Sequence, residues 1–97
     1  MANMGKYESI FIVNATLDEA AIAEVVAKFK GLVEENGTLV SVDEWGKRRL
    51  AYEINHMREG YYVLMTFDAP TDFPAELDRL YGINDAVIRY LTTTRKA

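Results

Sequence analysis

Two helix-like patterns separate four strand-like segments in this chain, and this alternation restricts the fold more than any other sequence feature. From Ile22 to Val33, apolar residues recur at spacings of three and four, which predicts a helix with one buried face. A second, shorter pattern of the same kind runs from Phe73 to Tyr81. The strand-like segments are rich in β-branched and aromatic residues and cover 6–14, 39–55, 61–68 and 86–94. The predicted order of elements is βαββαβ.

This order is that of the split βαβ, or ferredoxin-like, fold of the α+β class. Right-handed crossovers place both helices on one face of a four-stranded antiparallel sheet and leave the other face uncovered. The first strand is apolar on both faces, as expected of a strand in the middle of a sheet. We therefore expect strands one and three in the centre and strands two and four at the edges. The chain is expected to form a single domain, 1–97, with flexible ends at 1–3 and 95–97.

Capping residues predict where the two helices begin and end. The first helix begins either with a capping box of Thr16 and Glu19 or with Asp18 as the cap. The pair Asn36-Gly37 is expected to supply the left-handed residue that ends it. Gly82 is expected to end the second helix.

The second strand contains a break in its hydrophobic pattern. The apolar residues change phase across Gly46, which indicates a β-bulge or a sharp bend. The polar segment 56–60 follows this strand and is predicted to be a hairpin loop.

The composition limits both the chemistry and the location of the protein. None of the 97 residues is cysteine, so disulfides, thiolate metal sites and cysteine nucleophiles are excluded. No apolar stretch approaches the ~20 residues of a membrane span. No basic segment followed by an apolar run marks a signal peptide. We therefore expect a cytoplasmic protein.

The charges are unevenly distributed, although the net charge is −4. Acidic residues concentrate on the two predicted helices. The basic residues gather on and around the predicted strands at Lys47, Arg48, Arg49, Arg58, Arg89, Arg95 and Lys96. A protein with acidic helices and basic strands presents a positive face to phosphate even when its net charge is negative.

Three consecutive cations, Lys47, Arg48 and Arg49, lie between Trp45 and Tyr52 in a segment predicted to be a strand. A rigid basic cluster between aromatic residues suits a polyanion such as nucleic acid. The alternative is that the charges only protect an edge strand from aggregation, although three in a row exceed that need. Alternation places Arg48 on one face of the strand and its two neighbours on the other, unless a bend turns the strand.

The aromatic residues of the strands allow two interpretations. Trp45 is expected to pack over an edge of the core rather than to stack on a base. Tyr52, Tyr61 and Tyr62 are ambiguous in the same way, because exposed strand aromatics resemble the stacking platform of an RNA-recognition motif. The segment 59–66 matches the strand-three pattern of that motif at only two positions, so this mode of RNA recognition is not expected.

No constellation of residues predicts catalysis or a bound metal. His56 has no second histidine or cysteine with which to form a metal site. Asp43 and Glu44 are neighbours on a predicted strand, so they point to opposite faces and do not form an acid/base pair. The sequence contains no phosphate-cradling glycine loop and no nucleophile with a partnered base. We expect no enzymatic activity, no cofactor and no small-molecule substrate.

Several segments resemble the bacterial small-subunit ribosomal protein six family. They are 4–8, 14–18, 45–55, 58–63, 77–80 and 87–90, so the resemblance covers essentially Met4 to Thr94. Its most specific part is Trp-Gly-Lys-Arg-Arg-Leu-Ala-Tyr-Glu-Ile-Asn at 45–55. The resemblance implies a ferredoxin-like fold and a structural role. It implies binding to the central domain of the small-subunit ribosomal RNA, in a heterodimer with small-subunit ribosomal protein eighteen.

Under this interpretation, the site residues fall into two groups. Contacts to RNA phosphates are expected from Lys47, Arg48, Arg49, Arg89, Arg95 and Lys96. Contacts to the protein partner are expected from Trp45, Tyr52 and Tyr61, on an edge strand or on the open face of the sheet. A basic partner explains how an acidic protein takes part in RNA binding.

One other class of function stays open on the residues alone, and a third is disfavoured. A ferredoxin-like regulatory module that binds a small metabolite as a homodimer fits the uncovered sheet face and the lack of catalytic groups equally well. The triple cation discriminates, because it suits phosphates spread along RNA better than one small ligand. A small hydrolase on the same fold needs an anion-binding loop with a committed catalytic residue, which the sequence lacks.

Overall fold

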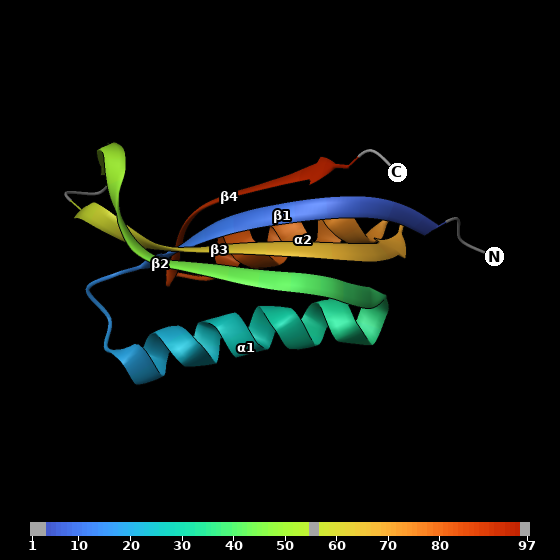
Figure 1. The fold of residues 1–97 in the computed structure, drawn as a ribbon, viewed down its shortest axis with the longest axis horizontal. Coiled ribbons are helices and arrows are strands. Elements are labelled where there is room, and N and C mark those ends of the chain that lie inside the picture. The colour runs from blue at the N-terminus through green and yellow to red at the C-terminus, as the bar shows by residue number, and fades with distance from the viewer. Residues whose placement is uncertain (1–3, 55–56, 96–97) are drawn as a thin grey trace.

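The computed structural model describes residues 4–54 and 57–95, and all of their side chains except those of 51–54 and 57. The elements are, in order, β1 (Met4–Asn14), α1 (Glu19–Asn36), β2 (Thr38–Ile54), β3 (Met57–Pro70), α2 (Phe73–Ile83) and β4 (Val87–Thr94) (Figure 1). The predicted order βαββαβ is confirmed. No helix among the described residues is long and apolar enough to cross a membrane.

The four strands form one antiparallel sheet in the order β2-β3-β1-β4. β1 lies between β3 and β4, and β3 lies between β1 and β2. The prediction that strands one and three occupy the centre of the sheet is therefore confirmed. The basic segment of β2 and the cation of β4 consequently lie on opposite edges.

Both helices cover the same face of the sheet, because side chains of α1 and α2 join those of β1 and β3 in one core. At its centre, three aromatic rings pack together. The ring centroid of Phe11 lies 5.4 Å from that of Phe29 and 5.0 Å from that of Tyr81, and the centroids of Phe29 and Tyr81 are 4.5 Å apart. We call the opposite side of the sheet the open face. It is formed by the alternate residues of each strand and carries Ile10, Ile12, Tyr62, Leu64, Arg89 and Leu91.

A hydroxyl network ties α2 to the sheet. Ser9 is fully buried, and its Oγ shares a 2.8 Å hydrogen bond with the phenol of Tyr81. Thr92 Oγ1 lies 3.1 Å from Ser9 Oγ and donates to Asp78 Oδ1 at 2.8 Å. Burial raises the pKa of the Tyr81 phenol, so this group stays protonated and neutral in the core. The network thus supplies the partners that buried hydroxyls require.

Asp18 is the cap at the start of α1. Its Oδ1 accepts a hydrogen bond from the backbone N–H of Ala21 at 2.7 Å. Thr16 is engaged elsewhere, because its backbone N–H and its hydroxyl both donate to Asn14 Oδ1, at 2.9 and 2.6 Å. Of the two predicted starts, the one with Asp18 as the cap is correct.

Both predictions for the helix C-termini are wrong. Gly37 follows α1 with φ −168°, which is extended rather than left-handed. Glycine is needed there for space, because a Cβ atom at this position would collide with the backbone oxygen of Asp68. α2 includes Gly82 and ends one residue later, with Asn84 as its C-cap.

The β2–β3 hairpin is longer than predicted. β3 begins at Met57, so the prediction of a loop over 56–60 is wrong for 57–60, and His56 lies outside the described residues. Figure 1 shows the light-green end of β2 curling away from the rest of the sheet. Leu50 is buried on the open face, and a Cβ at Gly60 would collide with Ile12 and lie 3.4 Å from Leu50 Cδ2. These three residues anchor the base of the hairpin to the sheet.

Arg95, which was expected in a flexible end, is held against the sheet. Its backbone N–H donates to the carbonyl of Lys6 at 2.9 Å. Its guanidinium forms an ion pair with Asp68, and the two side chains are only 20% and 34% exposed. Arg95 therefore acts as a clasp between the segment after β4 and β3, across β1.

We expect Arg95→Ala to lower the free energy of unfolding by about 1–2 kcal/mol, because it leaves the partly buried Asp68 carboxylate without its cation. The measurement is urea denaturation. Arg79→Ala is the matched control, since the two side chains of its ion pair with Glu76 are 59% and 49% exposed and its loss should lower the free energy of unfolding much less. Equal losses in the two variants would contradict the clasp.

Candidate functional site

A bulge at Gly46 decides how the basic segment of β2 is presented. Gly46 has φ +81°, and the pairing of β2 with β3 shifts register between Glu44 and Gly46. Trp45 is the extra residue of this bulge. The phase break seen in the sequence is therefore confirmed as a β-bulge.

The bulge places Trp45 on the open face, in a cluster with Tyr62 and Arg48 that we call the Trp45 cluster. The rings of Trp45 and Tyr62 stack, with centroids 6.1 Å apart and planes inclined by 15°. The Arg48 guanidinium carbon lies 5.4 Å from the centroid of the Trp45 ring, within cation–π range. Trp45 Nε1 donates to Asp43 Oδ2 at 3.0 Å, and the side chain stays 37% exposed. A preordered aromatic side chain with one cation on it is thus available to a partner.

Arg89 belongs to the same open face as the Trp45 cluster. The strand register puts Arg89, Ile12, Tyr62 and Gly46 in one row across the sheet. Three strand spacings separate Arg89 from Gly46, or about 14 Å. Beside Arg89, a 240 Å³ hollow is lined by Ile10, Ile12, Tyr90 and Leu91. The open face therefore combines two candidate RNA-binding arginines with an apolar centre.

Lys47 and Tyr61 lie on the other side of the sheet, which α1 covers. They are opposite each other in the β2–β3 register, and alternation puts Arg49 on the same side as Lys47. Tyr61 donates from its phenol to Glu44 Oε1 at 3.0 Å. Burial and the Glu44 carboxylate raise the pKa of Tyr61.

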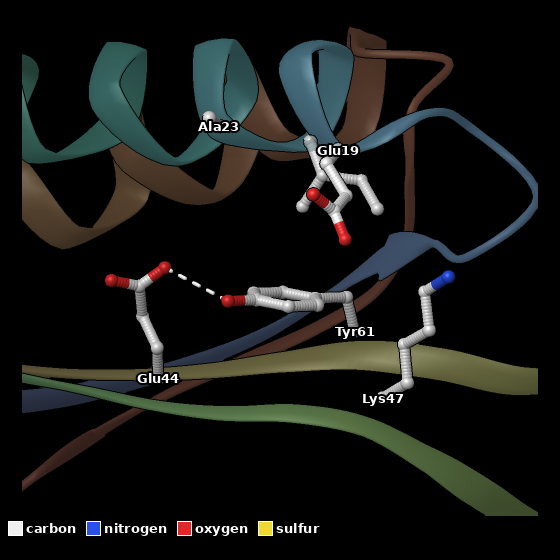
Figure 2. Close-up of a pocket in the computed structure, with 6 residues that line it drawn as sticks. Glu19, Ala23, Glu44, Lys47 and Tyr61 are labelled. Carbon is white, nitrogen blue, oxygen red and sulfur yellow. Dashed lines mark hydrogen bonds between the residues drawn. The ribbon is translucent and has the colours of Figure 1, made fainter.

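A cavity of 390 Å³ opens beside these residues, between α1 and the strands β2 and β3. We call it the helix-side cavity. It is lined by Glu19, Ile22, Ala23, Glu44, Lys47 and Tyr61 (Figure 2). Glu19, Ala23, Glu44 and Lys47 are exposed, so its mouth faces solvent.

Of the remaining predicted site residues, the structure describes the side chain of Arg95. Arg95 lies at the level of Lys6, six residues along β1 from Ile12, or about 20 Å away. Lys96 and the side chain of Tyr52 lie outside the described residues. The structure therefore brings together Arg48, Arg89 and Trp45 on one face, and Lys47, Arg49 and Tyr61 on the other.

Sequence reasoning missed the contributions of Glu19 and Ile10. Glu19 was assigned only to helix capping, yet its carboxylate lines the helix-side cavity. Ile10 was not singled out among the apolar residues of the first strand, yet it lines the hollow on the open face. The alternation of β1 contained the signal for Ile10, because every second apolar residue of that strand must face away from the helices.

We expect Gly46→Ala to lower the free energy of unfolding by about 1–2 kcal/mol, because an L-residue with a side chain is strained at positive φ. A Cβ at this position has no neighbour within 4 Å, so the cost comes from the backbone alone. Gly46→Asn should lose less, because asparagine tolerates the left-handed region better. Thermal denaturation of the two variants measures the difference, and equal losses would contradict the backbone explanation.

The chain is similar to one protein family over nearly its whole length. The family model described as "Ribosomal protein S6" matches residues 6–94. The chain is 52% identical over 94 residues to "Small ribosomal subunit protein bS6" of Clostridium botulinum (strain Hall), covering 96% of this chain and 100% of that protein. It is also 52% identical over 89 residues to the protein of the same name from Clostridium perfringens (strain SM101), covering 91% of this chain and 94% of that protein.

Solved structures agree with this similarity. The crystal structure of 30S ribosomal protein S6 from Thermotoga maritima matches with a TM-score of 0.90 at 30% identity, over 96% of this chain and 89% of that one. An uncharacterized protein of the same organism shares the fold alone, with a TM-score of 0.63 at 15% identity over 97% of this chain and 100% of that one. The chain therefore belongs to the ribosomal protein S6 family and is a structural, non-enzymatic component of the small ribosomal subunit.

Proposed function

We propose that this protein binds the central domain of the small-subunit ribosomal RNA as a heterodimer with small-subunit ribosomal protein eighteen. The observation that carries the RNA half is the bulged segment of β2, where Lys47, Arg48 and Arg49 follow Gly46 on an ordered edge strand. The protein half follows from the family resemblance and from the shape of the open face. Membership of the family supports both RNA binding and the heterodimer, but it does not identify the residues that make the contacts.

The three cations suit an RNA backbone that runs along the β2 edge. Arg48 lies on the open face, whereas Lys47 and Arg49 lie on the side of α1. A ligand on one face of the sheet would contact either Arg48 or the pair Lys47 and Arg49. An RNA backbone that follows the edge of the sheet can contact all three. Arg89 adds a cation on the open face at the opposite edge of the sheet. Arg95 contributes less, because its guanidinium is already paired with Asp68.

The open face suits a protein partner. Leu91, which lines the hollow beside Ile10 and Ile12, is 61% exposed, and Trp45 on β2 is 37% exposed. Aromatic and aliphatic side chains of this kind are typical anchors at protein interfaces. We assign Trp45, with Tyr52, to the partner contact. Tyr61 contacts the protein partner only if the partner also reaches the helix side of β2 and β3.

A basic partner would strengthen RNA binding by this protein, whose net charge is −4. Acidic residues on the helices repel phosphate, and the cations of β2 offset this only locally. A basic protein on the open face adds positive charge next to Arg48 and Arg89. The heterodimer is therefore the RNA-binding unit of this proposal.

The test uses three purified components: this protein, small-subunit ribosomal protein eighteen and a transcript of the RNA central domain. Sedimentation velocity of the two proteins should show a 1:1 complex. In native gels, the complex should bind the transcript much more tightly than this protein alone. The proposal fails if no complex forms, or if this protein alone binds the RNA as tightly as the mixture does.

A further inference from the structure

The helix-side cavity has the size and the lining of a binding site for a flat polar group. Its volume of 390 Å³ lies in the range of small-ligand pockets. Figure 2 shows the ring of Tyr61 lying above the strands, between Glu44 and Lys47, with Glu19 and Ala23 of α1 on its other side. A planar group that enters the cavity therefore lies between the Tyr61 ring and the helix.

The Tyr61 ring is held in place for stacking. Its phenol donates to Glu44 Oε1 at 3.0 Å, so the ring is fixed at its outer end as well as at the backbone. Tyrosine rings of this kind stack with unpaired bases in RNA-binding proteins. The hydrogen bond between Tyr61 and Glu44 thus fixes one wall of the cavity.

Glu19 offers the acceptor that selects among the bases. Within the described part of the chain, its carboxylate makes no hydrogen bond or ion pair, and Figure 2 shows it directed toward the Tyr61 ring. A carboxylate accepts two parallel hydrogen bonds from adjacent donors. Only guanine presents two adjacent donors, N1–H and N2–H, on its Watson–Crick edge. Adenine, cytosine and uracil each place an acceptor next to their donor.

The neighbouring cations favour a nucleotide over a basic side chain. Lys47 lines the cavity, and Arg49 lies on the same side of β2, two residues further along. Glu19 and Glu44 would attract an arginine or lysine of a protein partner, whereas Lys47 and Arg49 would repel it. A nucleotide instead places its base beside Glu19 and its phosphate beside the two cations.

We propose that the helix-side cavity binds an unpaired guanine of RNA, stacked on Tyr61 and read by the Glu19 carboxylate. This inference rests on the proposed function, because it deepens the contact of Lys47 and Arg49 with RNA. It assigns to the acidic start of α1 a role in selecting a base.

The test is titration of the ¹⁵N-labelled protein with GMP, AMP, CMP and UMP, followed by amide chemical shifts. GMP should shift the amides of Glu19, Ile22, Ala23 and Tyr61, and should bind about tenfold more tightly than the other nucleotides. Glu19→Gln should abolish this preference, because an amide offers one acceptor and one donor. Glu24→Gln, which removes an exposed carboxylate of α1 outside the cavity, should leave the preference unchanged. Equal shifts with all four nucleotides, or none in the cavity, would overturn the proposal.

The failure of this inference is distinguishable from the failure of the proposed function. The heterodimer with Glu19→Gln is measured on the central-domain transcript beside the wild-type heterodimer. If GMP leaves the cavity amides unmoved while the wild-type heterodimer binds the transcript, the base site is wrong and the proposed function stands. If N-acetyl-arginine amide shifts the cavity amides more than GMP does, a basic protein segment is the occupant and the guanine site is equally refuted.

Discussion

Replacement of Lys47, Arg48 and Arg49 together by glutamine is expected to weaken binding of the heterodimer to its RNA on the order of 100-fold at moderate salt. The same variant should reduce the slope of log affinity against log salt by about two to three, because each lost phosphate contact releases one counterion fewer. All three side chains are exposed on an edge strand, so their removal leaves the core intact. Filter binding over a series of salt concentrations measures both quantities.

The matched control removes the same charge from the helices. Lys28, Lys30 and Arg79 lie on α1 and α2, outside the basic segment of β2, and their triple glutamine variant changes the net charge equally. It should shift affinity far less, because only local cations contact phosphate. If the β2 variant binds the RNA as tightly as wild type at moderate salt, the assignment of these cations is wrong.

Phe29→Ala is expected to lower the free energy of unfolding by about 3–5 kcal/mol, which is the usual cost of deleting a buried aromatic ring. Phe29 is fully buried, and its ring lies 5.4 Å from that of Phe11 and 4.5 Å from that of Tyr81. A domain of this size has a total stability of only about 5–15 kcal/mol. Urea denaturation followed by circular dichroism should therefore show a large fall in the midpoint.

The control for Phe29→Ala is Glu24→Ala, an exposed substitution on the same helix, which should stay within about 0.5 kcal/mol of wild type. Phe29 lies on neither the open face nor the β2 edge. The fraction of Phe29→Ala that remains folded should therefore bind the RNA normally. A loss below 1 kcal/mol would show that the core repacks around the missing ring.

The order and placement of the elements were predictable from the residues because each depends on a local pattern. Apolar spacing of three and four predicted α1, and apolar residues on both faces predicted that β1 is central. The bulge at Gly46 was also predictable, because a change of hydrophobic phase must accompany an extra residue in a strand.

The errors arise where tertiary contacts, rather than local preferences, decide. Gly37 suggested a left-handed cap, but it is glycine because the backbone of β3 passes too close for a Cβ. The polar segment 57–60 suggested a loop, but the hairpin extends there as a ribbon, where a strand has little core to face. The ion pair of Arg95 with Asp68, far away in sequence, was likewise not predictable from a local pattern.

The candidate site was predictable in its residues and only partly in its geometry. Alternation correctly separated Arg48 from Lys47 and Arg49. It did not reveal that Arg48 lies over the ring of Trp45, because that contact depends on the conformation of the bulge. The helix-side cavity was not predictable at all, since it exists only where the start of α1 passes over β2 and β3.

The position of β1 between β3 and β4 also affects how the protein is made. The ribosome synthesises β1 before either of its neighbours, and β4 only after the other five elements. The pairing of Tyr7 with Thr94, which completes the sheet, forms only after β4 has been synthesised. During translation, the apolar central strand β1 therefore has an unpaired edge, while only the β2–β3 hairpin pairs locally. Completion of the fold must be late in synthesis, and the nascent chain is most prone to aggregation just before β4 emerges.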